Sequence, residues 1–132
     1  MPRLPVVCIV DDDESVRESL TGLLRSNGYD ARPFGSAEEF LANLDALATD
    51  CAILDVTMPG LSGADLQEKL LSRGSPLPLV FITARTESGL HRRLLERGAL
   101  ACLVKPFHED ELIGAVNAAI DVKRRQGEKG AP

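Results

Sequence analysis

The sequence contains no long apolar run, no repeated cysteine motif and no excess of positive charge. Its uninterrupted apolar stretches fall far short of the roughly 18 residues of a membrane-spanning helix, and the first one ends at Asp11, Asp12 and Asp13. With 20 acidic and 15 basic residues the net charge is -5, so no overall positive field favours nucleic acid or an anionic membrane. We therefore expect no direct contact of this chain with nucleic acid or a membrane.

The three cysteines, Cys8, Cys51 and Cys102, are widely spaced and lie inside short apolar runs. They form no CxxC or cysteine–histidine pattern of the kind that binds zinc. An odd number of separated cysteines also argues against a disulfide framework. We interpret them as reduced, buried core residues, which indicates a cytoplasmic protein.

The chain has 132 residues, of which 44% are hydrophobic and 27% are charged. This is the size and composition of one folded domain. Apolar periodicity is lost near the end of the sequence, where a chain without packing contacts is usually mobile. We predict one domain over residues 1–125 and a flexible tail, or the start of a linker, over residues 126–132.

Short apolar runs alternate with amphipathic segments along the chain. Four runs have the length and continuous apolar character of strands buried on both faces of a parallel sheet, at residues 6–10, 51–54, 79–82 and 101–104, and a weaker one lies at 30–34. Apolar residues three and four positions apart predict helices between them. The third helix should bury Leu66, Leu70 and Leu71. The fourth helix should bury Leu90, Leu94 and Leu95. This alternation predicts an α/β fold with an open parallel sheet of five βα units.

Polar residues end four of the five predicted strands. They are Asp11, Asp12 and Asp13 after the first, Asp55 after the third, Thr83 after the fourth and Lys105 after the fifth. In an open parallel sheet the ligand site lies beyond the carboxyl ends of the strands, so these side chains should converge. Crowded carboxylates need a cation, and hard oxygen ligands favour Mg²⁺. A hydroxyl and an ammonium beside them suit phosphoryl transfer to an aspartate nucleophile.

Asp13 is more simply explained as the N-cap of the first helix.

Four segments carry a family resemblance: IVDDD at 9–13, LDVTMPGLSG at 54–63, FITA at 81–84 and KPF at 105–107. Together they resemble the receiver domain of bacterial two-component response regulators over about residues 6–123. The resemblance implies a doubly wound, flavodoxin-like sheet with strand order 2-1-3-4-5.

The resemblance also implies the roles of the strand-end residues. Asp55 would accept a phosphoryl group from a phosphohistidine of a sensor histidine kinase. The Asp11, Asp12 and Asp55 carboxylates and the backbone carbonyl of Thr57 would bind Mg²⁺.

Thr83 and Lys105 would bind the phosphoryl group and, with Asp55, form the catalytic set. The chain would catalyse only its own phosphorylation and slow dephosphorylation, and would not be an enzyme in the ordinary sense. The family often has a cis peptide bond before the residue that corresponds to Pro106, and X-Pro bonds are where cis peptides occur.

Thr83 and Cys102 are the predicted switch residues. The family often has tyrosine or phenylalanine at the position of Cys102, so we expect the output to depend more on movement of the fourth helix. The partners would be an effector domain or protein, or a second copy of the chain after phosphorylation. A candidate contact surface is the exposed face of the fourth helix, with His91, Arg92, Arg93 and Arg97.

The segments VDDDESVR at 10–17 and PFGSAEEFL at 33–41 narrow the resemblance to the FixJ-type subfamily. In that subfamily the receiver usually precedes a helix-turn-helix DNA-binding domain. We expect either a single-domain regulator or a piece of a longer one, acting in transcriptional or other signalling control.

Two other functions remain open. A phosphatase similar to the haloacid dehalogenase superfamily would use Asp11 and Asp13 as its D-x-D pair, but Glu14 and Ser15 differ from the usual D-x-D-G-T and Asp55 would have no role. A phosphorylation-independent pseudo-receiver would bind its partner equally well after Asp55→Asn.

Overall fold

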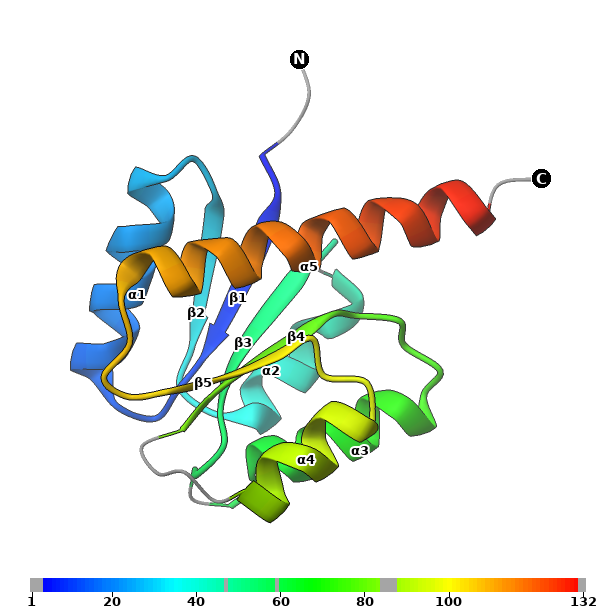
Figure 1. Cartoon of the computed structure of the whole chain (residues 1–132), viewed down its shortest axis with the longest axis horizontal. Helices are drawn as coiled ribbons and strands as arrows, with labels where there is room; N and C mark the ends of the chain where they lie inside the picture. The colour runs from blue at the N-terminus through cyan, green and yellow to red at the C-terminus, as the bar shows by residue number, and fades with distance from the viewer. Residues whose placement is uncertain (1–3, 47, 59, 84–87, 131–132) are drawn as a thin grey trace.

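The computed structural model describes residues 4–46, 48–58, 60–83 and 88–130. Strands and helices alternate along this part of the chain (Figure 1). Its elements are β1 (Val6–Val10), α1 (Glu14–Ser26), β2 (Asp30–Phe34), α2 (Ala37–Asn43), the 3₁₀ turn η1 (Leu44–Ala46), β3 (Cys51–Asp55), α3 (Gly63–Ser72), β4 (Leu79–Thr83), α4 (Ser88–Glu96), β5 (Ala101–Val104) and α5 (Glu109–Gly130).

The strands form one parallel sheet in the order β2-β1-β3-β4-β5. Helices α1 and α5 cover one face of the sheet, and α2, α3 and α4 cover the other (Figure 1). Side chains alternate between the two faces along each strand, so Val7 and Ile9 pack with α1 and α5 while Cys8 and Val10 pack with the other three helices. The predicted fold and strand order are confirmed.

The helix starts follow from local hydrogen bonds. Asp13 caps α1 as predicted, because its Oδ1 accepts the Val16 N–H at 3.1 Å. Ser36 accepts the Glu39 N–H at 3.1 Å at the start of α2, but the Glu39 carboxylate accepts the Gly35 N–H instead of returning to Ser36. Ser36 and Glu39, which have the spacing of a capping box, therefore form only half of one.

Two leucines expected in the core are exposed. Leu71 in α3 is 50% exposed and Leu95 in α4 is 46% exposed, whereas Leu70 and Leu94 beside them are buried. A helix places adjacent residues about 100° apart, so only one member of each Leu-Leu pair can face the sheet. Cys102 is also only partly buried, unlike Cys8 and Cys51.

Helix α5 continues to Gly130, past the predicted domain end at residue 125. The segment 126–130 is therefore part of this last helix. Figure 1 shows this end of α5 projecting beyond the sheet. The boundary between a domain at 1–125 and a linker at 126–132 stays a prediction. Across the described ranges, no helix combines the length and apolar character needed to cross a bilayer.

Candidate functional site

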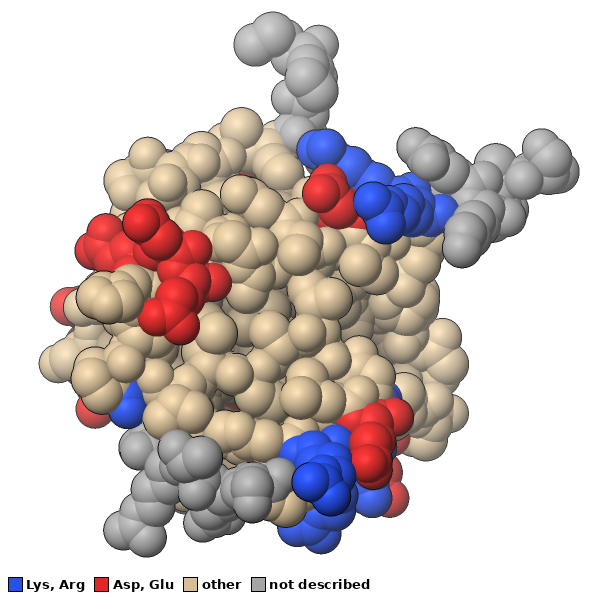
Figure 2. Space-filling view, viewed as in Figure 1, with Lys and Arg blue, Asp and Glu red and all other residues tan. Residues whose placement is uncertain are grey.

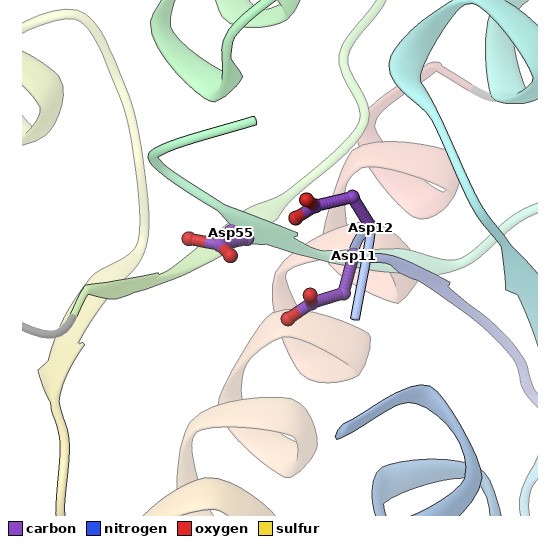
Figure 3. A group of neighbouring side chains, drawn as sticks. All are labelled: Asp11, Asp12 and Asp55. Carbon is purple, nitrogen blue, oxygen red and sulfur yellow. The ribbon is translucent and has the colours of Figure 1, made fainter. Parts of the chain in front are cut away.

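Three aspartates meet at the carboxyl edge of the sheet. Asp11 and Asp12 follow β1 and Asp55 ends β3, and one carboxylate oxygen from each lies within 4.8 Å of the other two (Figure 3). Asp11 is buried, Asp55 is half-buried and Asp12 is exposed. The cluster is therefore anchored in the protein on one side and open to solvent on the other.

The pairing of the central strands brings these aspartates together. β1 and β3 are parallel neighbours with Val10 beside Leu54, so Asp11, the next residue, lies level with Asp55. Parallel strands are only about 4.8 Å apart. Residues more than 40 positions apart in sequence thus share one small volume, as the strand-end pattern predicts.

Asp55 is held by the loop that follows β3. Its Oδ1 accepts the Thr57 N–H at 3.1 Å. Gly63, the first residue of α3, lies close to the Asp55 backbone. A Cβ atom at Gly63 would lie 2.6 Å from the Asp55 carbonyl oxygen and 3.0 Å from Val56 Cα. Only glycine permits α3 to start this close to the strand end, which fixes the position of Asp55.

Electrostatics at the cluster favour the binding of a cation. Burial is the main cause that raises the pKa values of Asp11 and Asp55 above their ordinary range, and the neighbouring carboxylates raise them further. The positive charge of Lys105 lowers both pKa values and offsets part of this rise. Three carboxylates grouped in this way fit a hard divalent cation such as Mg²⁺, which prefers oxygen ligands.

Thr83 and Lys105 stand at the ends of the next two strands. Thr83, the last residue of β4, is buried and lies beside Val104 of β5. The Lys105 N–H donates to the Thr83 carbonyl at 2.8 Å, and the Lys105–Pro106 peptide is cis as predicted. The structure thus places both residues at the same sheet edge as the aspartates.

Two further predicted site residues are Thr57 and Cys102. Thr57 is exposed, and its N–H faces Asp55; the metal-binding role of its carbonyl stays a prediction. Cys102 lies beside Phe81 in the sheet and packs on the face covered by α4. Its switch role also stays a prediction. Ala84, the last residue of the FITA segment, lies outside the described residues.

The predicted contact surface on α4 needs one correction. Arg92, Arg93 and Arg97 are exposed, and Figure 2 shows basic side chains gathered where Figure 1 has α4. His91, however, is partly buried, and its Nε2 is enclosed without a hydrogen-bond partner among the described residues. It faces the protein more than the solvent.

Two features of the site were missed in the sequence. Ser62 and Asp65 form a complete capping box at the start of α3. A serine followed three residues later by an acidic residue is a signal from which this cap could have been predicted. Arg17 donates to the Asp11 backbone carbonyl at 2.8 Å. Nothing in the spacing of Arg17 predicts that contact.

Comparison with known proteins agrees with this geometry. The family model described as the response regulator receiver domain matches residues 7–117. Response regulator protein TmoT of Ectopseudomonas mendocina is 40% identical over 123 residues, covering 93% of this chain and 56% of that protein. Transcriptional regulatory protein FixJ of Bradyrhizobium diazoefficiens is 35% identical over 125 residues, covering 95% of this chain and 59% of that protein.

Among solved structures, the crystal structure of FixJ-N is similar with a TM-score of 0.84 and 31% identity, covering 92% of this chain and 96% of that one. The chain spans a little over half the length of the two curated relatives. The family match covers most of the chain and includes all three clustered aspartates. The chain belongs to the response regulator receiver domain family and is of the FixJ type.

Proposed function

We propose that this chain is a phosphorylation-dependent receiver in which Asp55 accepts a phosphoryl group in the presence of Mg²⁺. Receiver domains are regulatory and are not classical enzymes. The observation that carries the proposal is the meeting of the Asp11, Asp12 and Asp55 carboxylates within 4.8 Å of one another, with Lys105 following β5 at the same edge of the sheet.

The reaction forms a P–O bond to one Asp55 oxygen. The bond that breaks is the P–N bond of a phosphohistidine on a sensor histidine kinase, and the neutral imidazole leaves after it takes up a proton. The Asp55 Oδ1 is already oriented by the Thr57 N–H at 3.1 Å. A carboxylate held in this way can attack a phosphorus atom from a fixed direction.

The residues around Asp55 would each stabilise part of the negative charge on the phosphoryl oxygens. The carboxylates of Asp11, Asp12 and Asp55 and the carbonyl of Thr57 would hold Mg²⁺, which neutralises charge on the phosphoryl oxygens when bound. The Lys105 ammonium would pair with a phosphoryl oxygen. The Thr83 hydroxyl would donate a hydrogen bond to another.

Phosphorylation would then change what the domain binds. It adds about -1.5 to -2 charge and strong acceptor oxygens at the sheet edge. Thr83 and Lys105 respond to that charge, and β5 carries Cys102 against the face covered by α4. The expected partners are a histidine kinase and an effector domain or protein, or a second copy of the chain, in the control of transcription or another signalling output.

Intact mass spectrometry tests the proposal. The chain is incubated with Mg²⁺ and acetyl phosphate, with Asp55→Asn and a metal-free sample as controls. A gain of one phosphoryl group in the unchanged chain, lost in both controls, is the expected result. No gain by a folded chain would contradict the proposal and favour a pseudo-receiver.

The phosphatase alternative requires Asp13 beside Asp11 in the site. Asp13 instead accepts the Val16 N–H as the cap of α1 and is not one of the clustered carboxylates. Repeated turnover of a phosphomonoester such as p-nitrophenyl phosphate, insensitive to Asp55→Asn, would nevertheless favour that function over the receiver.

A further inference from the structure

A hydrogen bond links α1 to the loop that carries two of the clustered aspartates. Arg17, the fourth residue of α1, is half-buried, and its Nη1 donates to the backbone carbonyl oxygen of Asp11 at 2.8 Å. The carbonyl of Asp11 and the amide nitrogen of Asp12 belong to one planar peptide unit. Arg17 therefore restrains the orientation of the peptide that joins the two aspartates.

Asp11 is held at each of its polar groups. Its N–H donates to the Phe34 carbonyl at 3.1 Å, its carbonyl accepts from Arg17 and its Oδ1 accepts the Asp13 N–H at 2.9 Å. The Phe34 bond continues the pairing of β1 with β2, and the Asp13 bond belongs to the loop itself. The Arg17 bond ties the Asp11 carbonyl to α1, in addition to the cap that Asp13 forms at the start of that helix.

The guanidinium of Arg17 lies beside the turn after β2. A Cβ atom at Gly35 would lie 3.4 Å from Arg17 Nη1 and 3.8 Å from a carboxylate oxygen of Glu39. That Glu39 oxygen also accepts the Gly35 N–H at 3.3 Å. The Arg17 guanidinium thus contacts the Asp11 carbonyl and lies beside Gly35, and these neighbours favour one orientation of its long side chain.

We propose that Arg17 is a positioning residue for the Mg²⁺ ligands Asp11 and Asp12, acting through the peptide that joins them. This inference rests on the proposed function for the identity of the ion. Arg17 bonds to a backbone oxygen and not to a carboxylate, so its role is to hold the two side chains at the spacing that the ion requires. Partners that orient metal ligands typically change metal affinity about 10- to 100-fold when they are removed.

Arg25 on the same helix provides a matched control. Its Nη2 donates to the Ala31 carbonyl at 3.0 Å, so Arg25→Met also removes one positive charge and one bond from α1 to a backbone oxygen. Ala31 lies within β2, three residues before the strand ends. Loss of this bond therefore leaves the peptide between Asp11 and Asp12 untouched.

The test is the Mg²⁺ dissociation constant of the full chain, measured from amide NMR signals without a phosphodonor. Arg17→Met should weaken Mg²⁺ binding about tenfold, while Arg25→Met should leave it within about twofold of the unchanged chain. Arg17→Lys restores one donor and should recover part of the loss. At saturating Mg²⁺, phosphoryl uptake by Arg17→Met should return close to the level of the unchanged chain, because the ion concentration offsets the weaker site.

Thermal unfolding in a chelator shows how much stability each methionine variant loses. Both should lose a similar amount, so a difference in Mg²⁺ affinity between them would come from the position of the ligands and not from stability. Equal Mg²⁺ affinity in folded Arg17→Met and Arg25→Met would overturn the inference, as would failure of the unchanged chain to bind Mg²⁺. If Arg17→Met does not fold, Arg17→Gln, too short to reach the carbonyl, replaces it with the same expectation. Mg²⁺ binding without phosphoryl uptake would refute the proposed function, and the affinities of the variants would still decide the role of Arg17.

Discussion

Replacement of Gly63 by alanine should destabilise the chain, because α3 begins in direct contact with the end of β3. The new Cβ would lie 2.6 Å from the Asp55 carbonyl oxygen, 3.0 Å from Val56 Cα and 3.1 Å from Phe81 Cε1. Ordinary contacts between carbon atoms lie near 3.5 to 4.0 Å. The two nearest atoms belong to the backbone, so neither can rotate away, and the helix or the strand must shift.

The expected loss is about 2 to 3 kcal/mol, the upper part of the range for overpacked sites. With about 2.1 cal/mol/K of unfolding entropy per residue, a chain of 132 residues should lose roughly 7 to 11 °C in Tm. Gly114→Ala is the control, because that glycine lies inside α5 with nothing within 4 Å of an added Cβ. It should gain about 0.5 to 1 kcal/mol from helix propensity.

Both variants can be measured by thermal and urea unfolding in a chelator, which keeps metal binding out of the comparison. Glycine to alanine should lower the free energy of unfolding of the chain when made at position 63 and raise it when made at position 114. A Gly63→Ala chain with the Tm of the unchanged protein would refute the reasoning. It would mean that the approach of α3 to Asp55 is loose enough to admit a methyl group.

Three further outcomes are expected. Asp55→Asn should stabilise the metal-free protein at neutral pH, because burial raises the pKa of Asp55 and disfavours its ionised form in the folded chain. Urea unfolding should show this gain disappearing as the pH falls through the raised pKa to below about 3.8, where the carboxyl is protonated in both states; a constant gain would contradict the assignment. A thiol reagent should modify only Cys102 in the folded protein and all three cysteines after denaturation, since Cys8 and Cys51 are fully buried and Cys102 is only partly buried. Rapid loss of three thiols from the folded chain would show that the core opens readily. Cys102→Tyr should leave phosphoryl uptake nearly unchanged while shifting the NMR signals of α4 and altering partner binding, because Cys102 packs on the face covered by α4; a large loss of uptake would place Cys102 in the phosphoryl site.

The composition and order of short segments were enough to predict the fold and the carboxylate cluster. Continuous apolar runs identify buried parallel strands, and parallel strands present their carboxyl ends at one edge. Asp11, Asp12 and Asp55 follow such runs directly, so their meeting is a consequence of strand pairing alone. The cis bond before Pro106 could be expected from the family resemblance.

Other features depend on angles and distances that the order of residues does not express. Leu70 and Leu71 are chemically identical, and only the rotation of α3 against the sheet buries the first and exposes the second. The extension of α5 to Gly130 is likewise absent from the apolar pattern, because a helix that projects beyond the sheet has no apolar face to bury.

The sequence by itself thus determined which residues end the strands and which chemistry they bring to one edge, because that information is local and periodic. The tertiary structure alone decided how those residues are held. Arg17 contacts the Asp11 carbonyl because the direction of α1 after β1 carries a long side chain back toward the strand end. Gly63 matters because α3 approaches Asp55 more closely than any side chain allows. Both contacts depend on the relative placement of whole elements, which side-chain packing sets and local sequence does not encode.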